Sequence, residues 1–597
     1  MAEYVAPIKD MRFVLHHVVG LDQVNTLPGW EEITEDVVDA ILEEAAKLAS
    51  EVLSPLNASG DREGATWKDG VVTMPRGFKA AYRQYIGGGW NNMLSPTQFG
   101  GQGLPHLLAT PVEEMWGSSN LAFKLCPMLT QGAIEAISYV GPDELRQAFL
   151  PKMIAGVWTG TMNLTEPQAG SDLSLVRTRA SPQADGTWRI KGQKIFITYG
   201  EHDLTDNIIH LVLARIEGAP EGVKGISLFA VPKFMVKSDG SLGARNDVKC
   251  VSIEHKLGIH ASPTAVLAYG EKDGAIGYLV GEANRGLEYM FIMMNAARLS
   301  VGLEGVAVAE RAYQRALAWS RERLQGRPAG GGAKTAPIIQ HPDVKRMLLT
   351  MKATTEAMRA LAYWTSALLD RARHHPDEAE RSRAQALVDL LIPVVKGWST
   401  EMGIEVASLG IQVHGGMGFI EETGAAQHLR DARITTIYEG TTGIQANDLV
   451  GRKMGREEGR TALALVAEME KTVATLAPSR DPSLKSIADC LGPALVKVRE
   501  TVQWVVKTYP ANPAAVAASS IYVLKLMGIA IGGWMLARSA EVASRALERG
   551  EGDAEFLKGK ILTTRFFAEH ILAQAGSLAA AATRGADSVL AVEEAML

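Results

Sequence analysis

At 597 residues the chain is too long for one hydrophobic core, so several domains are expected. Its hydrophobic content of 47% and charged content of 21% are typical of a soluble globular protein. A net charge of -6 without long basic runs argues against a dedicated nucleic-acid binder. Cys126, Cys250 and Cys490 lie far apart, which argues against a zinc site or disulfide framework and favours a reducing, cytoplasmic location.

The first residues carry neither a basic nor an apolar signal region, so no secretory signal is predicted. Residues 521–537 come nearest to a membrane span, but Lys525 and three glycines interrupt them. They also fall short of the roughly 20 clean apolar residues that a span needs. We therefore expect a buried helix here and no membrane association.

Four regions follow one another along the chain. Residues from about 32 to 155 have helical spacing, well developed over 36–53. Between about 159 and 280, short β-type runs are bounded by Gly, Pro, Asp and Asn. Long helical patterns return from about 285 to 457, and an amphipathic Ala/Leu/Val-rich part follows. The predicted domains are 1–158 (helical), 159–282 (β), 283–457 (helical bundle) and 458–597 (helical extension).

Residues 433–445 contain a candidate general base, Glu439, between Tyr438 and Gly440. The glycine would let the backbone turn tightly and let a ligand come close to the main chain. Taken alone, a glutamate before a glycine is more often a solvated loop residue. The rest of the chain changes that balance.

Four motifs resemble the acyl-CoA dehydrogenase family over roughly residues 30–455. They are Thr165-Glu-Pro-Gln-Ala-Gly-Ser-Asp172, Gly192-Gln-Lys-Ile-Phe-Ile-Thr198, Gln412-Val-His-Gly-Gly-Met-Gly-Phe419 and Ile437-Tyr-Glu-Gly-Thr441. The resemblance implies a mainly α fold with a central β-barrel domain between helical domains. The N-terminus, residues 126–132 and the C-terminal extension further resemble the long branch of the family that includes 3-methylmercaptopropionyl-CoA dehydrogenases.

The resemblance implies an FAD-dependent reaction on an acyl-CoA. Glu439 would remove the α-proton, and a β-hydride would pass to flavin N5, giving a trans-2-enoyl-CoA. Desolvation by a bound acyl chain should raise the pKa of the Glu439 carboxyl and make it a better base. The backbone N–H of Glu439 and the ribityl 2′-hydroxyl of FAD would bind the thioester oxygen. A minority of the family places its base before the arginine of Asn295-Ala-Ala-Arg298, but Ala297 stands there in this chain.

The resemblance also assigns binding residues. Near the flavin ring it places Met162, Leu164, Thr165, Phe196, Thr198 and Thr441, with Phe196 replacing a more usual tryptophan. For the FAD of a neighbouring subunit it implies Arg323, Gln325, Gln412, Gly415 and Gly416. For the acyl-CoA it implies Ser171, Asn295, Arg298, Tyr438 and Gly440. His414 could act as a second acid/base, although such a histidine is more often packed or hydrogen-bonded.

The expected protein is a homodimer that passes electrons to an electron-transfer flavoprotein. Its substrate would be 3-methylmercaptopropionyl-CoA or a short or medium acyl-CoA. One alternative is an acyl-CoA oxidase, which shares the half-reaction but uses oxygen. Another is a non-catalytic DNA-binding flavoprotein of the same fold. That role needs a basic C-terminal face, whereas residues 461–597 contain 14 Lys and Arg against 14 Asp and Glu.

Overall fold

The computed structural model describes residues 4–331 and 334–597, which form two compact units. One unit comprises Lys47–Pro105 and Ser119–Ser300, and contains the β domain. The rest of the described chain, with His106–Ser118 and Val301–Leu597 as its later parts, forms the other unit. Helix α9, Gly286–Glu322, begins in the first unit and ends in the second.

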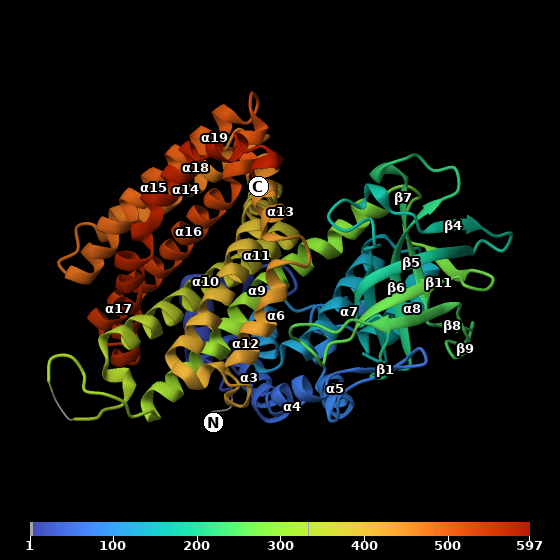
Figure 1. Cartoon of the computed structure of the whole chain (residues 1–597), viewed down its shortest axis with the longest axis horizontal. Helices are drawn as coiled ribbons and strands as arrows, with labels where there is room; N and C mark the ends of the chain where they lie inside the picture. Colours follow the sequence, from blue (N-terminus) through green and yellow to red (C-terminus); the bar gives the residue numbers. More distant parts are fainter. Residues whose placement is uncertain (1–3, 332–333) are drawn as a thin grey trace. The chain divides into compact units, whose positions relative to one another are not determined.

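The β domain is a closed ring of strands. The strand order is β10-β11-β5-β12-β7-β6-β3, and β4 pairs with both β5 and β6. Because β5, β12, β7, β6 and β4 return to β5, they close a barrel, as predicted (Figure 1). The strands are β3 (Trp158–Asn163), β4 (Arg179–Pro182), β5 (Trp188–Thr198), β6 (Asn207–Ile216), β7 (Ile226–Pro232), β8 (Phe234–Val236), β9 (Leu242–Arg245), β10 (Val248–Ile253), β11 (Thr264–Tyr269) and β12 (Ala275–Leu279).

Strand β6 shows why parts of this domain are apolar without alternation. Ile209, Leu211 and Leu213 pack into one hydrophobic cluster with helices α7 (Leu121–Val140) and α8 (Asp143–Ile154). The intervening Val212 and Ala214 pack into a second cluster with residues of β5, β7 and β11. Both faces of the strand are therefore buried, which removes the polar alternation of a half-exposed strand.

The helices of this unit are α4 (Pro55–Glu63), α5 (Phe78–Gly87), α7 (Leu121–Val140) and α8 (Asp143–Ile154). A small hairpin, β1 (Thr66–Lys68) with β2 (Val71–Thr73), interrupts the region that the sequence predicted as helical. Its outward residues are exposed, and Trp67 donates a hydrogen bond to the Cys250 carbonyl of the β domain at 3.1 Å. Strands of only three residues are too short to show a recognisable alternation of apolar and polar residues in the sequence.

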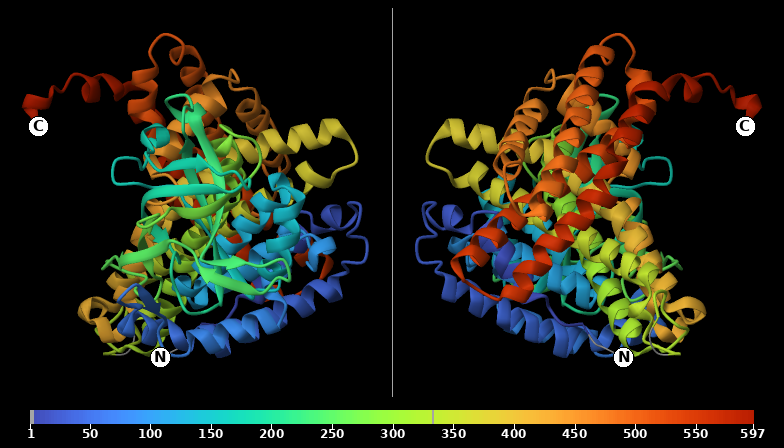
Figure 2. Two further views of the ribbon diagram at one scale, coloured as in Figure 1. Left: turned by 90° about the vertical axis from the view of Figure 1, so that its right-hand side faces the viewer. Right: turned by 90° about the vertical axis from the view of Figure 1, so that its left-hand side faces the viewer.

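The other unit is helical. Its elements are α1 (Ile8–Phe13), α2 (Leu21–Asn25), α3 (Glu35–Lys47), α6 (His106–Ser119), α10 (Pro342–His374), α11 (Glu378–His414), α12 (Ala425–Ala432), α13 (Thr442–Asn447), α14 (Arg460–Leu476), α15 (Pro482–Thr508), α16 (Pro513–Arg549), α17 (Ala554–His570), α18 (Ala575–Arg584) and α19 (Ala586–Leu590). In the C-terminal extension α15, α16 and α17 lie side by side, and the chain end runs out past α19 (Figures 1 and 2).

Among the residues that the structure describes, two helices, α9 and α16, are long and apolar enough to cross a membrane by length and composition. Most of each apolar window is buried inside the folded chain, 76% in α9 and 67% in α16. Helix α16 includes residues 521–537, which the sequence analysis placed in a buried helix. Trp398 of α11 packs against its Gly528 and Gly532, so these glycines make room for a large side chain.

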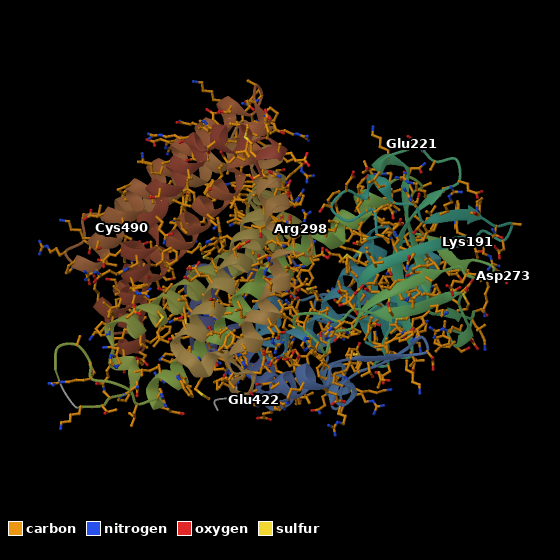
Figure 3. The ribbon with its side chains drawn as sticks, viewed as in Figure 1. Lys191, Glu221, Asp273, Arg298, Glu422 and Cys490 are labelled. Atoms are coloured by element: carbon orange, nitrogen blue, oxygen red, sulfur yellow. The ribbon has the colours of Figure 1, made fainter. Side chains whose placement is uncertain are left out.

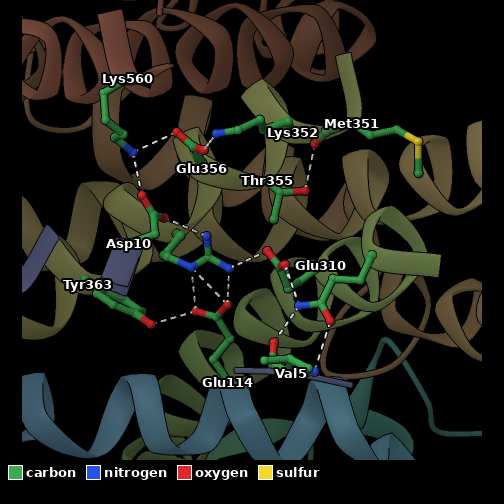
Figure 4. A network of polar contacts seen from close by, with 12 residues as sticks. Val5, Asp10, Glu114, Glu310, Met351, Lys352, Thr355, Glu356, Tyr363 and Lys560 are labelled. Carbon is green, nitrogen blue, oxygen red and sulfur yellow. Dashed lines mark hydrogen bonds and ion pairs between the residues drawn. The ribbon is translucent and has the colours of Figure 1, made fainter. Parts of the chain in front are cut away.

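A buried ion-pair cluster joins the chain's first helix to its extension (Figure 4). The Arg359 guanidinium pairs with Asp10 at 2.8 Å, with Glu114 at 2.6 Å and with Glu310 at 2.7 Å. The Lys560 ammonium on α17 lies 2.6 Å from Asp10 and 2.7 Å from Glu356. Burial by itself would raise the pKa of the Asp10 carboxyl, but Lys560 and Arg359 hold it well below its usual range.

Replacing Lys560 with methionine should destabilise the helical unit. The substitution removes the cation that Asp10 and Glu356 share. Because Asp10 keeps Arg359 and Glu356 keeps Lys352, we expect a loss of about 1.5–3 kcal/mol. Thermal melting should show a clear fall in Tm. Lys558→Met on the same helix is the matched control because Lys558 is exposed. Equal melting of the two variants would contradict a stabilising role for the cluster.

Candidate functional site

The segment with Glu439 is a tight turn between a short 3-10 helix, Arg433–Thr436, and helix α13. Glu439 and Gly440 both have positive φ, +55° and +87°. A Cβ at Gly440 would lie 2.8 Å from Nε2 of Gln445, so only glycine fits without displacement. The Thr441 hydroxyl accepts a hydrogen bond from the Ile444 N–H at 3.3 Å and caps α13.

Side chains from three helices hold this turn. The ammonium of Lys396 on α11 is fully buried and donates to the Gly440 carbonyl at 2.6 Å. Nε2 of buried Gln445 on α13 donates to the Glu439 carbonyl at 3.1 Å. The Tyr438 hydroxyl donates to the carboxylate of Glu304 on α9. The backbone on both sides of the half-buried Glu439 side chain is therefore fixed.

Tyr438 is kept as a neutral hydrogen-bond donor. Burial raises the pKa of its hydroxyl well above the usual value, and the negative charge of Glu304 raises it further. A neutral phenol keeps the proton that it donates to Glu304. The Tyr438 side chain thus holds the turn in place. Its hydroxyl does not ionise at ordinary pH.

A second fixed loop lies in the β domain. The Lys194 ammonium of β5 pairs with Glu166 at 2.8 Å and donates to the Leu164 carbonyl at 3.0 Å. The Ile195 N–H donates to the Thr165 carbonyl at 2.9 Å. Residues 164–166 are consequently attached to β5.

Glu166 is a structural carboxylate. Besides Lys194 it accepts hydrogen bonds from the backbone of Arg177 and from both the backbone and the hydroxyl of Thr178. Burial acts to raise the pKa of Glu166, but Lys194 and these donors lower it on balance. Burial lowers the pKa of Lys194 to about 8, against the opposing effect of Glu166.

The candidate flavin residues of this domain come from adjacent chain segments. Met162 lies in β3, paired with Leu211 of β6, while Phe196 and Thr198 lie near the end of β5. Phe196 has a positive φ of +59° and a side chain that is 59% exposed. The exposed Phe196 ring lies two residues after Lys194, whose ion pair with Glu166 fixes the neighbouring loop. An exposed ring in such a fixed setting suits contact with a flat cofactor ring better than packing in the protein core.

The remaining cofactor candidates lie on the helical unit. Arg323 and Gln325 are exposed just after α9, where His341 Nε2 donates to the Gln325 carbonyl at 2.8 Å. Gln412, Gly415 and Gly416 are exposed at the end of α11, and open space surrounds both glycines. The next residues include Phe419, whose side chain is 86% exposed.

His414 does not face a site. Its ring stacks on Trp319 with centroids 5.2 Å apart, and Nδ1 donates to the Gly410 carbonyl at 2.7 Å. Burial lowers the pKa of the ring. His414 is thus a packed, neutral histidine, the more common of the two roles that the sequence left open.

The substrate candidates upstream of the turn lie in the unit with the β domain. Ser171 is exposed, and Arg298 is a buried residue of α9 (Figure 3). The side chain of Asn295 lies outside the described residues. Ala297 is buried one position before Arg298 and has no group that could accept a proton.

Sequence reasoning missed Lys194, Lys396 and Glu304 as functional supports. Lys396 stands within an apolar run, Leu-Ile-Pro-Val-Val-Lys-Gly-Trp, and Lys194 directly precedes a shorter one, Ile-Phe-Ile. A lysine in such a run must reach a partner because an unpaired buried charge is costly. That signal was present, but it does not identify the partner.

Four family models cover most of the chain. Residues 35–157, 161–269 and 284–454 match the N-terminal, middle and C-terminal domains of acyl-CoA dehydrogenase. Residues 465–593 match a domain described as acetyl-CoA dehydrogenase C-terminal like. The last match coincides with the helical extension.

Full-length relatives have the same organisation. The chain is 50% identical over 588 residues to 3-methylmercaptopropionyl-CoA dehydrogenase of Ruegeria pomeroyi, covering 98% of this chain and 99% of that protein. It is 35% identical to a butyryl-CoA dehydrogenase of Syntrophomonas wolfei, with 95% of each covered. An acyl-CoA dehydrogenase of Bacillus anthracis complexed with FAD has the same fold, with a TM-score of 0.74, 20% identity and coverage of 98% and 92%.

Proposed function

Because the chain belongs to the acyl-CoA dehydrogenase family, we propose that it is an FAD-dependent dehydrogenase in which Glu439 removes the α-proton of an acyl-CoA thioester. The product is a trans-2-enoyl-CoA. The observation that carries this proposal is the turn at Glu439, whose carbonyl and the next one are both held by buried side chains. A carboxylate on so fixed a backbone suits a base that must meet one particular C–H bond.

The chain's own groups supply the proton chemistry. The Glu439 carboxylate takes the α-proton, and the Glu439 N–H donates to the thioester oxygen as negative charge develops there. The positive φ at Glu439 and Gly440 sets the direction of that N–H. FAD, when bound, supplies the hydride acceptor and a second donor, its ribityl 2′-hydroxyl.

Two groups of residues bind the cofactor in this proposal. Met162, Leu164, Thr165, Phe196, Thr198 and Thr441 hold the flavin ring, and Arg323, Gln325, Gln412, Gly415 and Gly416 reach the FAD of a partner subunit. The exposed Met417, Phe419 and Ile420 beside the glycine loop support a homodimer, since a second copy would cover them. The Arg323 guanidinium suits the pyrophosphate because it can donate two parallel hydrogen bonds.

The substrate is a short acyl-CoA, with 3-methylmercaptopropionyl-CoA as the first candidate. The 50% identity to the Ruegeria pomeroyi enzyme over nearly the whole of both chains supports this choice. Ser171, Asn295, Arg298, Tyr438 and Gly440 contact the acyl-CoA. The enzyme works in the cytoplasm and passes its electrons to an electron-transfer flavoprotein.

Glu439→Gln should abolish rapid flavin bleaching while FAD content and acyl-CoA binding persist. The amide has nearly the shape of the carboxylate but cannot take the proton, and loss of a general base typically slows a reaction about 10²–10⁴-fold. Stopped-flow absorbance under anaerobic conditions measures the rate. Glu405→Gln, at an exposed position of α11, is the matched control. Fast bleaching in Glu439→Gln would show that another group is the base.

Acyl-CoAs of graded length, with the thioether member included, test the substrate. We expect 3-methylmercaptopropionyl-CoA and its straight-chain equivalent in length to bleach the flavin fastest, with rates about tenfold or more lower for long chains. A maximum at long chains would contradict a short-chain enzyme. Timed reoxidation of the reduced enzyme in air adds a second result, because rapid reoxidation would indicate an oxidase.

A further inference from the structure

A cavity of about 520 Å³ lies within the helical unit, between the α10–α11 pair and the C-terminal extension. Its wall includes Trp364 of α10, Arg383 of α11, Arg460 of α14, and Trp534 and Arg538 of α16. None of its lining residues belongs to the candidate site around Glu439 or to the proposed FAD contacts. The volume lies within the range of roughly 300–1,000 Å³ that small-molecule sites have.

The cavity has an aromatic wall. Trp364 and Trp534 meet edge to face, with ring centroids 5.1 Å apart and planes at 80°. Nε1 of Trp534 already donates to the Thr472 hydroxyl at 2.8 Å, so this indole is fixed in place. Leu368, Leu387 and Leu465 extend the apolar surface. Trp534 itself is only 3% exposed. A flat, apolar ligand ring would therefore lie against the half-buried Trp364.

The side chains that line the cavity carry a net positive charge. Four arginines and two glutamates line the cavity, in a chain whose net charge is negative. Glu380 is engaged by Arg371 at 3.0 Å and faces Arg383 at 3.8 Å. Glu468, the other acid of the wall, pairs with Lys471 at 2.7 Å. Arg460 and Arg538 are therefore the arginines of the wall that could bind a ligand.

Within the described chain, Arg460 and Arg538 form no ion pair. Nε of Arg460 donates to the Glu457 carbonyl at 3.2 Å, and its side chain is otherwise exposed. The Arg538 guanidinium lies 5.2 Å from the Trp534 ring centroid, and burial lowers its pKa. The Glu541 and Glu468 carboxylates offset this effect only in part and form no ion pair with Arg538 among the described residues, so an incoming anion would stabilise the guanidinium further. Its planar fork matches phosphate oxygens.

We propose that this cavity binds a nucleotide, with its base against Trp364 and its phosphates on Arg460 and Arg538. The recognised chemistry is a flat ring linked to phosphate, and both a free nucleotide and the nucleotide end of CoA carry it. The site is separate from the reaction proposed for Glu439, and its occupation does not depend on that reaction. A ligand here would also connect the α10–α11 pair to the extension, because residues of both line the cavity.

Calorimetric titration of the FAD-loaded enzyme with ADP and, separately, with CoA tests the site. We expect ADP to bind saturably, to quench tryptophan fluorescence, and to bind about tenfold or more weakly to Arg460→Ala and to Arg538→Gln. Arg480→Ala, at an exposed position between α14 and α15, is the matched control and should bind as wild type does. Turnover without nucleotide should be unchanged in Arg460→Ala.

Adenosine and inorganic pyrophosphate separate the two halves of the ligand. Each should bind more weakly than ADP, because adenosine lacks the phosphates and pyrophosphate lacks the ring. If only CoA shows binding that Arg460→Ala weakens, CoA is the source of the nucleotide. The proposal is overturned if neither ADP nor CoA binding is sensitive to the arginine variants, or if pyrophosphate binds as tightly as ADP.

Discussion

The structure of the turn that contains Glu439 depends on one buried ammonium group. Lys396 has no access to solvent and donates to the Gly440 carbonyl at 2.6 Å. Burying a charge is costly unless polar groups surround it, so the Gly440 carbonyl stabilises the buried ammonium of Lys396. In return, the ammonium fixes the backbone of the turn. This mutual requirement holds residues 438–441 in a conformation with two successive positive φ values, which the chain alone would not favour.

The β domain uses the same device. The buried Lys194 of β5 binds both Glu166 and the Leu164 carbonyl, which attaches the loop of the first motif to β5. In each case a lysine on a regular element fixes an irregular segment that carries proposed site residues. Loops held in this way keep a defined geometry without being apolar themselves. The Arg359 and Lys560 cluster extends the principle to the chain's two ends, since it ties Asp10 of α1 to α17.

Much of the fold could be predicted from the sequence, because long helices and apolar strands carry strong periodic signals. The long helices α9, α10 and α11 and the strands β5, β6 and β7 fall where those signals lie. The hairpin β1–β2 was missed because three residues a strand carry too little pattern. Strand β5 is longer than its local pattern suggests, because Gly192 interrupts that pattern without ending the pairing with β11.

The candidate site likewise contains residues that the sequence pointed to and residues that it could not. Glu439 was identified from its motif, and Gly440 from the turn that it permits. The partners that hold the turn could not be predicted, because Lys396 and Glu304 are 43 and 135 positions away from Glu439 in the sequence. No local pattern specifies contacts over such separations. His414 shows the converse, since its position in a glycine-rich motif suggested chemistry while its contacts are those of a packed ring.

The most direct test of this account is the kinetics of Lys396→Met in the FAD-loaded enzyme. If Lys396 positions Glu439, kcat should fall about tenfold or more while acyl-CoA affinity and FAD content stay close to wild type. Gln445→Leu, which removes the donor to the Glu439 carbonyl, should reproduce the effect more weakly. An unchanged kcat in Lys396→Met, or a loss that comes entirely from lost FAD or weaker substrate binding, would contradict the account.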